Sequence, residues 1–208
     1  MQGYPRRGSD TPAQEAHMAL PSTTAERFRE VAAGFTAQVE AVAADSWDAQ
    51  TPCTEWKARD LVGHIVSWAG PALEDAGVDV TFTEDKNSDP AEAWRQFVTV
   101  TQAALEDPAI ADTPVTRGPI PDQSLSRNIS GFLIPDIFMH TWDLARSQGR
   151  DVELDTDFAE KNLAGFMSLG DKLRVGGSFG APVEAPADAT PTIRLMAYVG
   201  RDPLFGLG

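Results

Sequence analysis

Two side chains that can bind a cation, Asp136 and His140, are four residues apart in the sequence. On a helix this spacing places both on one face, one turn apart. A third candidate, His64, lies in a distant segment, at helical spacing from the apolar residues Leu61 and Ile65. Burying an imidazole costs free energy unless it finds a partner, and a divalent cation held by two histidines and a carboxylate would satisfy all three groups. The sequence therefore predicts a metal site formed by His64, Asp136 and His140.

Each histidine taken alone has a simpler interpretation. A single inward histidine is more often a core residue, hydrogen-bonded to a carbonyl or a carboxylate, than a metal ligand. The combination favours a metal because sites in helical bundles are built from inward side chains on facing helices, often with an i, i+4 pair on one of them. The prediction therefore depends on two helices bringing His64 and His140 together.

Two neighbouring carboxylates have a less direct part in this prediction. Asp60 also stands four residues before His64, but its place in the first turn of the expected helix suggests an interaction with the helix N-terminus. Asp143 follows His140 by about one turn, and two roles are equally open to it: an acceptor that orients the imidazole, or a solvated carboxylate. Neither is predicted to be a direct ligand.

The chain has a single cysteine and one further histidine. The lone Cys53 excludes an intrachain disulfide framework and a cysteine-rich zinc site. No histidine stands next to it in the sequence, so we interpret it as structural rather than nucleophilic. His17 lies in a polar N-terminal segment, where an exposed histidine is expected. Residues 1–20 are predicted to form a loosely attached tail, and residues 21–208 one domain.

Hydrophobic periodicity, capping residues and prolines predict an all-α chain. A proline-rich loop over residues 108–130 is expected either to cross the end of a bundle or to cover a site. The expected helices span about residues 23–44, 57–70, 89–107 and 135–149, followed by one that Asp155 caps and a short one from Thr190 to Gly200.

Composition limits the partners. The formal net charge of -14 argues against nucleic acid and anionic membrane surfaces, since both require clusters of Lys and Arg. No apolar run approaches the roughly 20 residues needed to cross a bilayer, and the start of the chain lacks the apolar core of a signal peptide. We therefore expect a cytoplasmic protein that binds neither nucleic acid nor a membrane, and a homodimer is open.

Three motifs in order resemble the actinobacterial DinB-like metal-binding family, which shares its metal-binding domain with mycothiol-dependent maleylpyruvate isomerase. They are WDAQTPCTEWKARDLVGH at 47–64, DIFMHTWDLAR at 136–146 and GRDP at 200–203. The resemblance covers about residues 22–205. It implies a DinB-like four-helix bundle in up-down-down-up order, with additional short C-terminal helices.

The resemblance also implies a divalent metal near one end of the bundle, usually zinc and sometimes nickel. His64 matches the first ligand of the family and His140 the last. Relatives similar to the isomerase have a glutamate four residues before the last histidine, where this chain has Asp136, a carboxylate one methylene shorter. Direct, water-bridged and shifted ligation by Asp136 are therefore all open.

Several activities are compatible with this site. The resemblance favours a metal-dependent thiol transferase or isomerase, in which a low-molecular-weight thiol such as mycothiol attacks a small electrophile. Hydrolysis would need a base, for which Asp136 or Asp143 are the candidates. A non-catalytic metal or small-ligand binding protein is the third possibility. Two histidines and a carboxylate also suit Fe(II), although the resemblance favours zinc or nickel.

Overall fold

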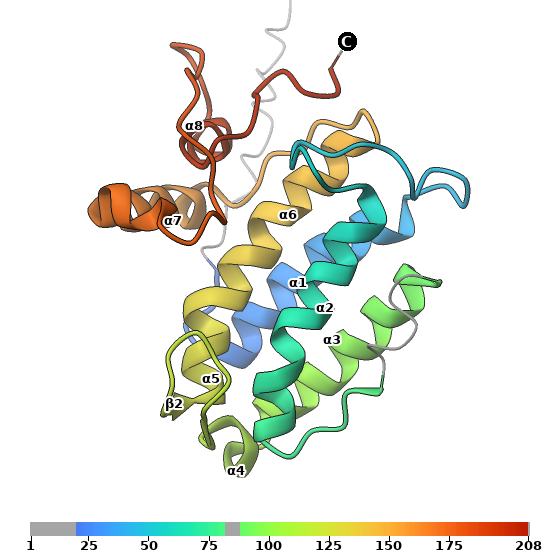
Figure 1. Cartoon of the computed structure of the whole chain (residues 1–208), viewed down its shortest axis with the longest axis vertical. Helices are drawn as coiled ribbons and strands as arrows, with labels where there is room; N and C mark the ends of the chain where they lie inside the picture. The colour runs from blue at the N-terminus through green and yellow to red at the C-terminus, as the bar shows by residue number, and fades with distance from the viewer. Residues whose placement is uncertain (1–19, 82–87, 208) are drawn as a thin grey trace, which may run out of the picture.

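The computed structural model describes residues 20–81 and 88–207. Four long helices form a bundle: α1 (Thr24–Glu40), α2 (Ala58–Asp75), α3 (Pro90–Glu106) and α6 (Ile134–Ser147). Helix α1 packs against α3 and α6, and α2 packs against the same two helices from the opposite corner. Helices α1 and α6 run upward in Figure 1, whereas α2 and α3 run downward. The predicted all-α bundle with up-down-down-up order is confirmed.

Most helix starts follow from capping residues that the sequence displays. In four of the described helices of eight residues or more, the side chain before the first turn accepts a hydrogen bond from the backbone N–H three residues later, which satisfies a donor that has no partner within the helix. The capping residues are Thr23, Asp89, Asp155 and Thr190. These four predicted starts are confirmed.

The first helix ends earlier than expected, at Glu40 rather than near residue 44. Arg150, which follows α6, donates hydrogen bonds to the backbone oxygens of Gln38 and Ala41 at 3.2 and 3.1 Å. These carbonyls lie in the last turn, where helical partners are missing, so a guanidinium satisfies them instead. A residue more than a hundred positions away therefore stabilises the end of α1.

The prediction that the second helix stops before Pro71 is wrong, because α2 continues through this proline to Asp75. Proline removes one hydrogen bond of the helix and crowds the preceding turn. Burial of the next turn offsets this cost, since Ala72 and Leu73 belong to the core. The end of α2 is also held by Asp75, which accepts hydrogen bonds from Thr116 and from Arg117.

The segment 108–130, predicted to be a loop, contains regular structure. A short helix α4 (Pro108–Ala111) is followed by two antiparallel strands, β1 (Pro114–Val115) and β2 (Gln123–Ser124), and by α5 (Leu125–Asn128). These elements cross one end of the bundle, at the bottom of Figure 1. The prediction underestimated them because each is only two to four residues long.

A π-helix, Ile129–Leu133, joins α5 to α6, so the helical path begins well before Pro135. In this wider turn the N–H of Ile134 bonds to the carbonyl of Ile129. A π turn carries one extra residue, which changes the phase of the helix just before Pro135. Pro135 thus lies in the first turn of α6, as predicted, but not at the start of the helical path.

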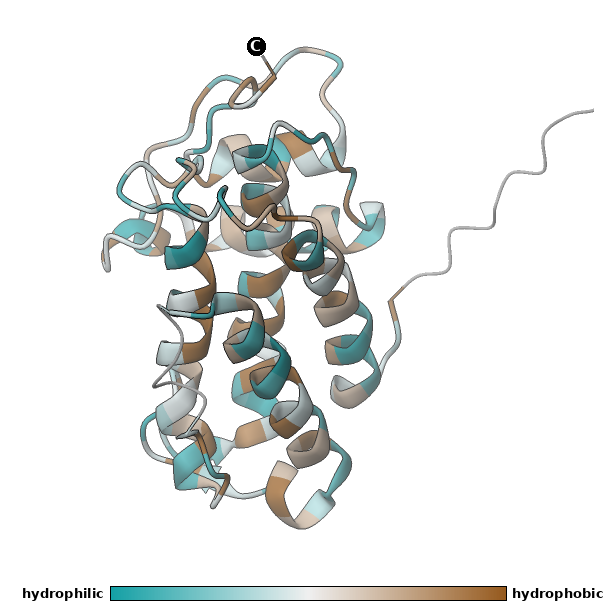
Figure 2. Cartoon of the chain, turned by 90° about the vertical axis from the view of Figure 1, so that its right-hand side faces the viewer, coloured by the Kyte–Doolittle hydropathy of each residue, from teal (hydrophilic) through white to brown (hydrophobic). Residues whose placement is uncertain are grey.

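A continuous apolar core fills the bundle. It includes an aromatic cluster in which Phe35 lies edge-on to Trp94, with ring centroids 4.5 Å apart. Figure 2 shows hydrophobic and hydrophilic bands alternating along the helices, as expected for helices with one buried side. None of the helices in the described ranges is long and apolar enough to cross a membrane.

The C-terminal segment packs beside α6 rather than within the bundle (Figure 1). It consists of α7 (Thr156–Leu169), a 3-10 turn (Gly170–Arg174) and α8 (Pro191–Tyr198). Gly200 ends the last helix as predicted, with a positive φ of 90°. Asp155 caps α7 as predicted, and Met167, near the end of this helix, is 59% exposed.

Candidate metal centre

Helices α2 and α6 bring the three predicted ligands together. His64 lies in the second turn of α2, and Asp136 and His140 lie one turn apart on α6. The Nε2 atom of His64 is 3.3 Å from Oδ2 of Asp136, and Nε2 of His140 is 3.4 Å from Oδ1 of the same carboxylate. The two imidazole rings lie at 82° to each other, with centroids 5.4 Å apart. The carboxylate thus lies between two imidazoles that are distant in the sequence.

The spacing of these donor atoms fits a small divalent cation. In a tetrahedral zinc site with donor–metal distances of about 2.1 Å, neighbouring donors lie roughly 3.4 Å apart. One donor atom from each of His64, Asp136 and His140 can be chosen so that all three lie within 4.8 Å of one another. Small side-chain movements would place all three around one ion. The chemistry and the spacing of the donors therefore suit zinc or a similar metal.

A second carboxylate fixes the orientation of His140. The Nδ1–H group of His140 donates to Oδ2 of Asp143 at 2.9 Å, and Asp143 has no exposed surface. With the proton on Nδ1, the other ring nitrogen can offer its lone pair to a cation, as in the carboxylate–histidine–metal arrangement of many metalloproteins. Of the two roles considered for Asp143, the structure supports the acceptor that orients the imidazole.

Two residues that sequence reasoning had not placed at the site surround Asp143. The thiol of Cys53, in the loop between α1 and α2, donates to Oδ2 of Asp143 at 3.3 Å. Arg201, which follows α8, donates to both oxygens of Asp143 at 3.3 and 3.4 Å and to the sulfur of Cys53 at 3.1 Å. Periodicity gives no signal for either, because one stands in a loop and the other after a helix end. Both nevertheless belong to the motifs at 47–64 and 200–203.

Cys53, His140 and Asp143 form a second group with donor atoms close enough for a metal. The guanidinium of Arg201 contacts both the sulfur and the carboxylate of this group. A cation placed there would be repelled by the arginine and would compete with its hydrogen bonds. The group around His64 and Asp136 is therefore the better candidate.

Burial and charge act in opposite directions on the acidic and basic groups of the centre. Burial alone would raise the pKa of Asp136, but the charges and hydrogen bonds of His140 and His64 outweigh it and hold this pKa well below its ordinary value. Burial would lower the pKa of His140, but Asp136 and then Asp143 raise it well above the ordinary value. Both carboxylates thus favour the protonated form of His140, and a metal ion bound at its Nε2 would compete with a proton there.

Burial also sets the state of the cysteine. It raises the pKa of the Cys53 thiol, and the negative charge of Asp143 raises it further, against smaller opposite effects of His140 and Arg201. A thiol is a poor nucleophile until it loses its proton. The interpretation of Cys53 as a non-nucleophilic residue is thus supported on electrostatic grounds.

The candidate centre is partly exposed on the side of His64 and Asp136. The side chains of His64 and Asp136 are 29% and 21% exposed, whereas that of His140 is 4% exposed. Two half-buried tryptophans flank the accessible side: the ring of Trp56 lies 4.5 Å from that of His64, and the indole N–H of Trp68 donates to Oδ2 of Asp136 at 3.0 Å. A ligand would therefore approach past two indoles.

Other predicted residues lie outside the centre. Asp60 accepts a hydrogen bond from the backbone N–H of Lys57 at 2.9 Å, which agrees with its predicted place at the N-terminus of the helix. The segment 108–124 is bound to Asp75 at the far end of α2, about 16 Å along the helix from His64, so it does not cover the centre. His17 and all but the last residue of the expected tail lie outside the described residues.

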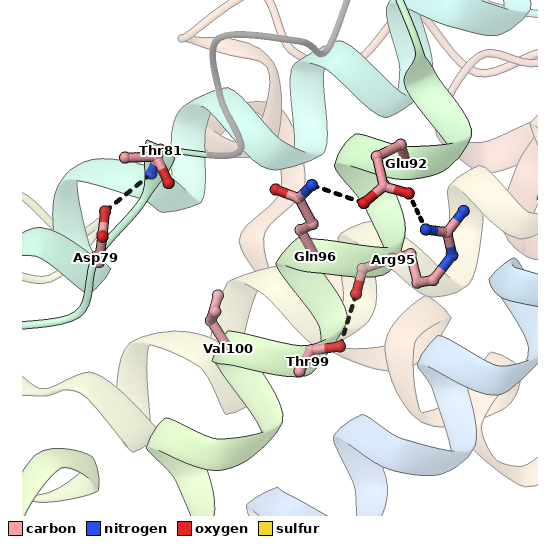
Figure 3. A pocket seen from close by; sticks show the side chains of 7 residues that line it. All are labelled: Asp79, Thr81, Glu92, Arg95, Gln96, Thr99 and Val100. Atoms are coloured by element: carbon pink, nitrogen blue, oxygen red, sulfur yellow. Dashed lines mark hydrogen bonds and ion pairs between the residues drawn. The ribbon is translucent and has the colours of Figure 1, made fainter.

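A shallow hollow of about 380 Å³ lies away from these residues, between the segment 79–81 and α3 (Figure 3). Its polar groups are largely bonded to one another. Gln96 and Arg95 both contact Glu92, and the backbone N–H of Thr81 donates to Asp79. The hollow contains neither a histidine nor a cysteine, and its polar groups offer no comparable chemistry.

Comparison with known proteins agrees with this architecture. The family model of the mycothiol maleylpyruvate isomerase N-terminal domain matches residues 28–145, more than half of the chain. The chain belongs to this family. The matched range contains all three candidate ligands and ends just after Asp143, so the metal-binding DinB-like domain predicted from the motifs is confirmed as the family of this chain. Arg201 lies beyond the matched range.

Two relatives, both uncharacterized proteins from strains of Mycobacterium tuberculosis, are 28% identical to this chain over 176 residues. The alignment covers 80% of this chain and 91% of each relative, so the similarity extends beyond the matched family domain into the C-terminal segment. No solved structure shows a significant match.

Proposed function

We propose that this protein binds a divalent metal, zinc in the first instance, through His64, Asp136 and His140, and that it transfers or isomerises a small electrophile with the help of a thiol. The observation that carries the proposal is the convergence of the His64 and His140 imidazoles on the partly exposed carboxylate of Asp136. The family supplies the expectation of a thiol, because it is the family of the N-terminal domain of mycothiol maleylpyruvate isomerase.

The residues of the chain account for binding and orientation. Three protein ligands on a zinc-like ion leave at least one position for an external group, as in catalytic zinc sites. A metal bound there would act as a Lewis acid that lowers the pKa of a thiol entering that position. His140 is held in place by Asp143, and Asp136 by the indole N–H of Trp68. Trp56 and Trp68 contact His64 and Asp136 and would line the approach of a ligand.

The thiol must come from outside the chain. Cys53 lies behind His140, on the side of Asp143, and burial raises the pKa of its thiol. It is the only cysteine in the sequence. A thiol-dependent reaction at the accessible side, between His64 and Asp136, would therefore require a small thiol as cosubstrate, and mycothiol is the candidate that the family suggests.

Hydrolysis is a weaker proposal because the site has no free base. Asp136 is engaged by two histidines and an indole N–H, and Asp143 is fully buried behind His140. To act as a base, Asp136 would have to give up part of these contacts, and Asp143 has no exposed surface through which to reach water. A non-catalytic metal-binding protein remains the second candidate, since it would need the same ligands but no base.

The experiment has two stages. Protein purified without added metal is analysed for bound elements, and then its zinc-loaded form is incubated with a small electrophile such as a maleyl compound, with and without mycothiol. A transferase or isomerase consumes the electrophile only when thiol is present, and His140→Ala abolishes both metal content and turnover. Metal binding without turnover would select the non-catalytic alternative. A zinc content unchanged in His140→Ala would reject the proposed ligand set.

A further inference from the structure

We infer that Arg201 is a positioning residue for the candidate metal centre: it holds the Asp143 carboxylate in the orientation in which Asp143 fixes His140. The inference rests on the proposed function insofar as it concerns metal affinity. It assigns a role to the C-terminal segment, which lies beyond the range matched by the family domain. Arg201 would act without touching either the metal or a substrate.

The contacts of Arg201 form a fork around Asp143. Its Nε donates to Oδ1 at 3.4 Å and its Nη2 donates to Oδ2 at 3.3 Å. The same Oδ2 accepts the Nδ1–H of His140 at 2.9 Å. Two parallel contacts from a planar guanidinium fix the plane of a carboxylate, whereas a single contact would allow it to rotate. The arginine therefore determines which oxygen faces the imidazole.

Burial limits the partners that are available to Asp143. Asp143 has no exposed surface, and the whole of Arg201 is 8% exposed. A buried carboxylate that loses its cationic partner must find other donors, since water cannot reach it. Among the described residues, the other side chains that donate to Asp143 are His140 and, weakly, the thiol of Cys53. Loss of the guanidinium would thus change the position of Asp143 and, through it, the ring of His140.

The backbone next to Arg201 is closely packed, which restricts the position of this residue. Gly200 has a φ of 90°, and a Cβ atom at this position would lie 2.7 Å from the Cα atom of Gly180. The side chain of Arg201 also donates through Nη1 to the carbonyl of Val199 at 3.2 Å. The backbone packs closely at residue 200 and the guanidinium has bonds on two sides. Such a fixed group suits a positioning role better than a role in capturing ligands.

The test compares Arg201→Met and Arg201→Lys with the matched control Arg194→Met. Arg194 lies in α8 and also pairs with a carboxylate, Glu160, but at the surface and away from the centre. The zinc dissociation constant is measured by competition with a chelator, and the absorption spectrum of bound Co²⁺ reports the ligand geometry. Far-ultraviolet circular dichroism and thermal unfolding confirm that each variant folds.

Arg201→Met is expected to weaken zinc binding by about 10- to 100-fold, as for other residues that orient metal ligands, and to alter the Co²⁺ spectrum. Arg201→Lys keeps the charge but not the fork, so it should recover only part of the affinity. Arg194→Met should match the wild type. Wild-type zinc affinity and an unchanged Co²⁺ spectrum in both Arg201 variants would overturn the inference.

Metal-free protein provides a separate readout. If the wild type binds no zinc, the proposed function fails, but the orientation of His140 can still be followed by ¹H–¹⁵N nuclear magnetic resonance of the imidazole. The Nδ1–H of His140 should exchange slowly in the wild type because it bonds to a buried carboxylate, and faster in both Arg201 variants. An identical Nδ1–H signal and exchange rate in wild type and variants would reject the positioning role independently of any metal.

Discussion

The indole N–H of Trp68 offers a sharp test of the candidate centre. It donates to Oδ2 of Asp136 at 3.0 Å, and this carboxylate lies between the two histidines. Replacing Trp68 with phenylalanine keeps an aromatic ring near the site but removes this donor. Asp136 would then be free to rotate between His64 and His140. Metal binding would have to order this side chain, which lowers the affinity for the metal.

The size of the effect follows from the type of hydrogen bond. A hydrogen bond to a charged group contributes roughly 1.5–3 kcal/mol. Because both side chains are partly exposed, the lower end of this range applies. A difference of about 1.4 kcal/mol changes a dissociation constant by about tenfold. We therefore expect Trp68→Phe to weaken zinc binding about tenfold.

The chain contains a matched control for this substitution. The indole N–H of Trp94 donates to Oγ1 of Thr36 at 2.9 Å, within the core between α1 and α3 and away from the centre. Trp94→Phe should lower the melting temperature without changing zinc affinity, whereas Trp68→Phe should change mainly zinc affinity. The zinc dissociation constants of both variants are measured by chelator competition, and their melting temperatures by thermal unfolding. Equal zinc affinities for wild type and Trp68→Phe would show that Trp68 does not hold Asp136 for a metal.

Three further substitutions test the site and the fold. His64→Ala should abolish stoichiometric zinc in elemental analysis, because it leaves only the two ligands from α6, and retention of one zinc per chain would contradict the ligand set. Gly200→Ala should destabilise the fold by roughly 2 kcal/mol or more. Residue 200 has a positive φ, which a residue with a Cβ atom rarely adopts, and the added Cβ would lie 2.7 Å from the Cα atom of Gly180. An unchanged melting temperature would show that the turn relaxes freely. Asp75→Asn should be less stable than the wild type at pH 7. Hydrogen bonds from Thr116 and Arg117 lower the pKa of Asp75, so its contribution is present above the unfolded pKa of about 4 and is lost as the pH falls below it. The difference in melting temperature should therefore shrink at low pH, and a constant difference from pH 7 to strongly acidic conditions would contradict this assignment.

Much of the architecture could be predicted from local signals. Thr23, Asp89, Asp155 and Thr190 indicated four helix starts because capping is an interaction between residues three positions apart. The errors came from distant contacts. Helix α2 passes through Pro71 because the following turn is buried in the core, and α1 ends where Arg150 binds its last carbonyls.

In the candidate site, too, local signals predicted some residues, and distant contacts decided the others. The i, i+4 spacing places Asp136 and His140 on one face of a helix whatever surrounds them, and apolar neighbours direct His64 inward, so the sequence alone was enough to nominate these three residues. Periodicity gave no information on Cys53 and Arg201, which stand in a loop and beyond a helix end. Arg201 reaches Asp143, 58 positions earlier, because the C-terminal segment packs beside α6. Cys53 reaches the same buried carboxylate from the loop between α1 and α2. Such convergence depends on the three-dimensional path of the chain, since no local pattern records which distant groups a buried charge will require as partners.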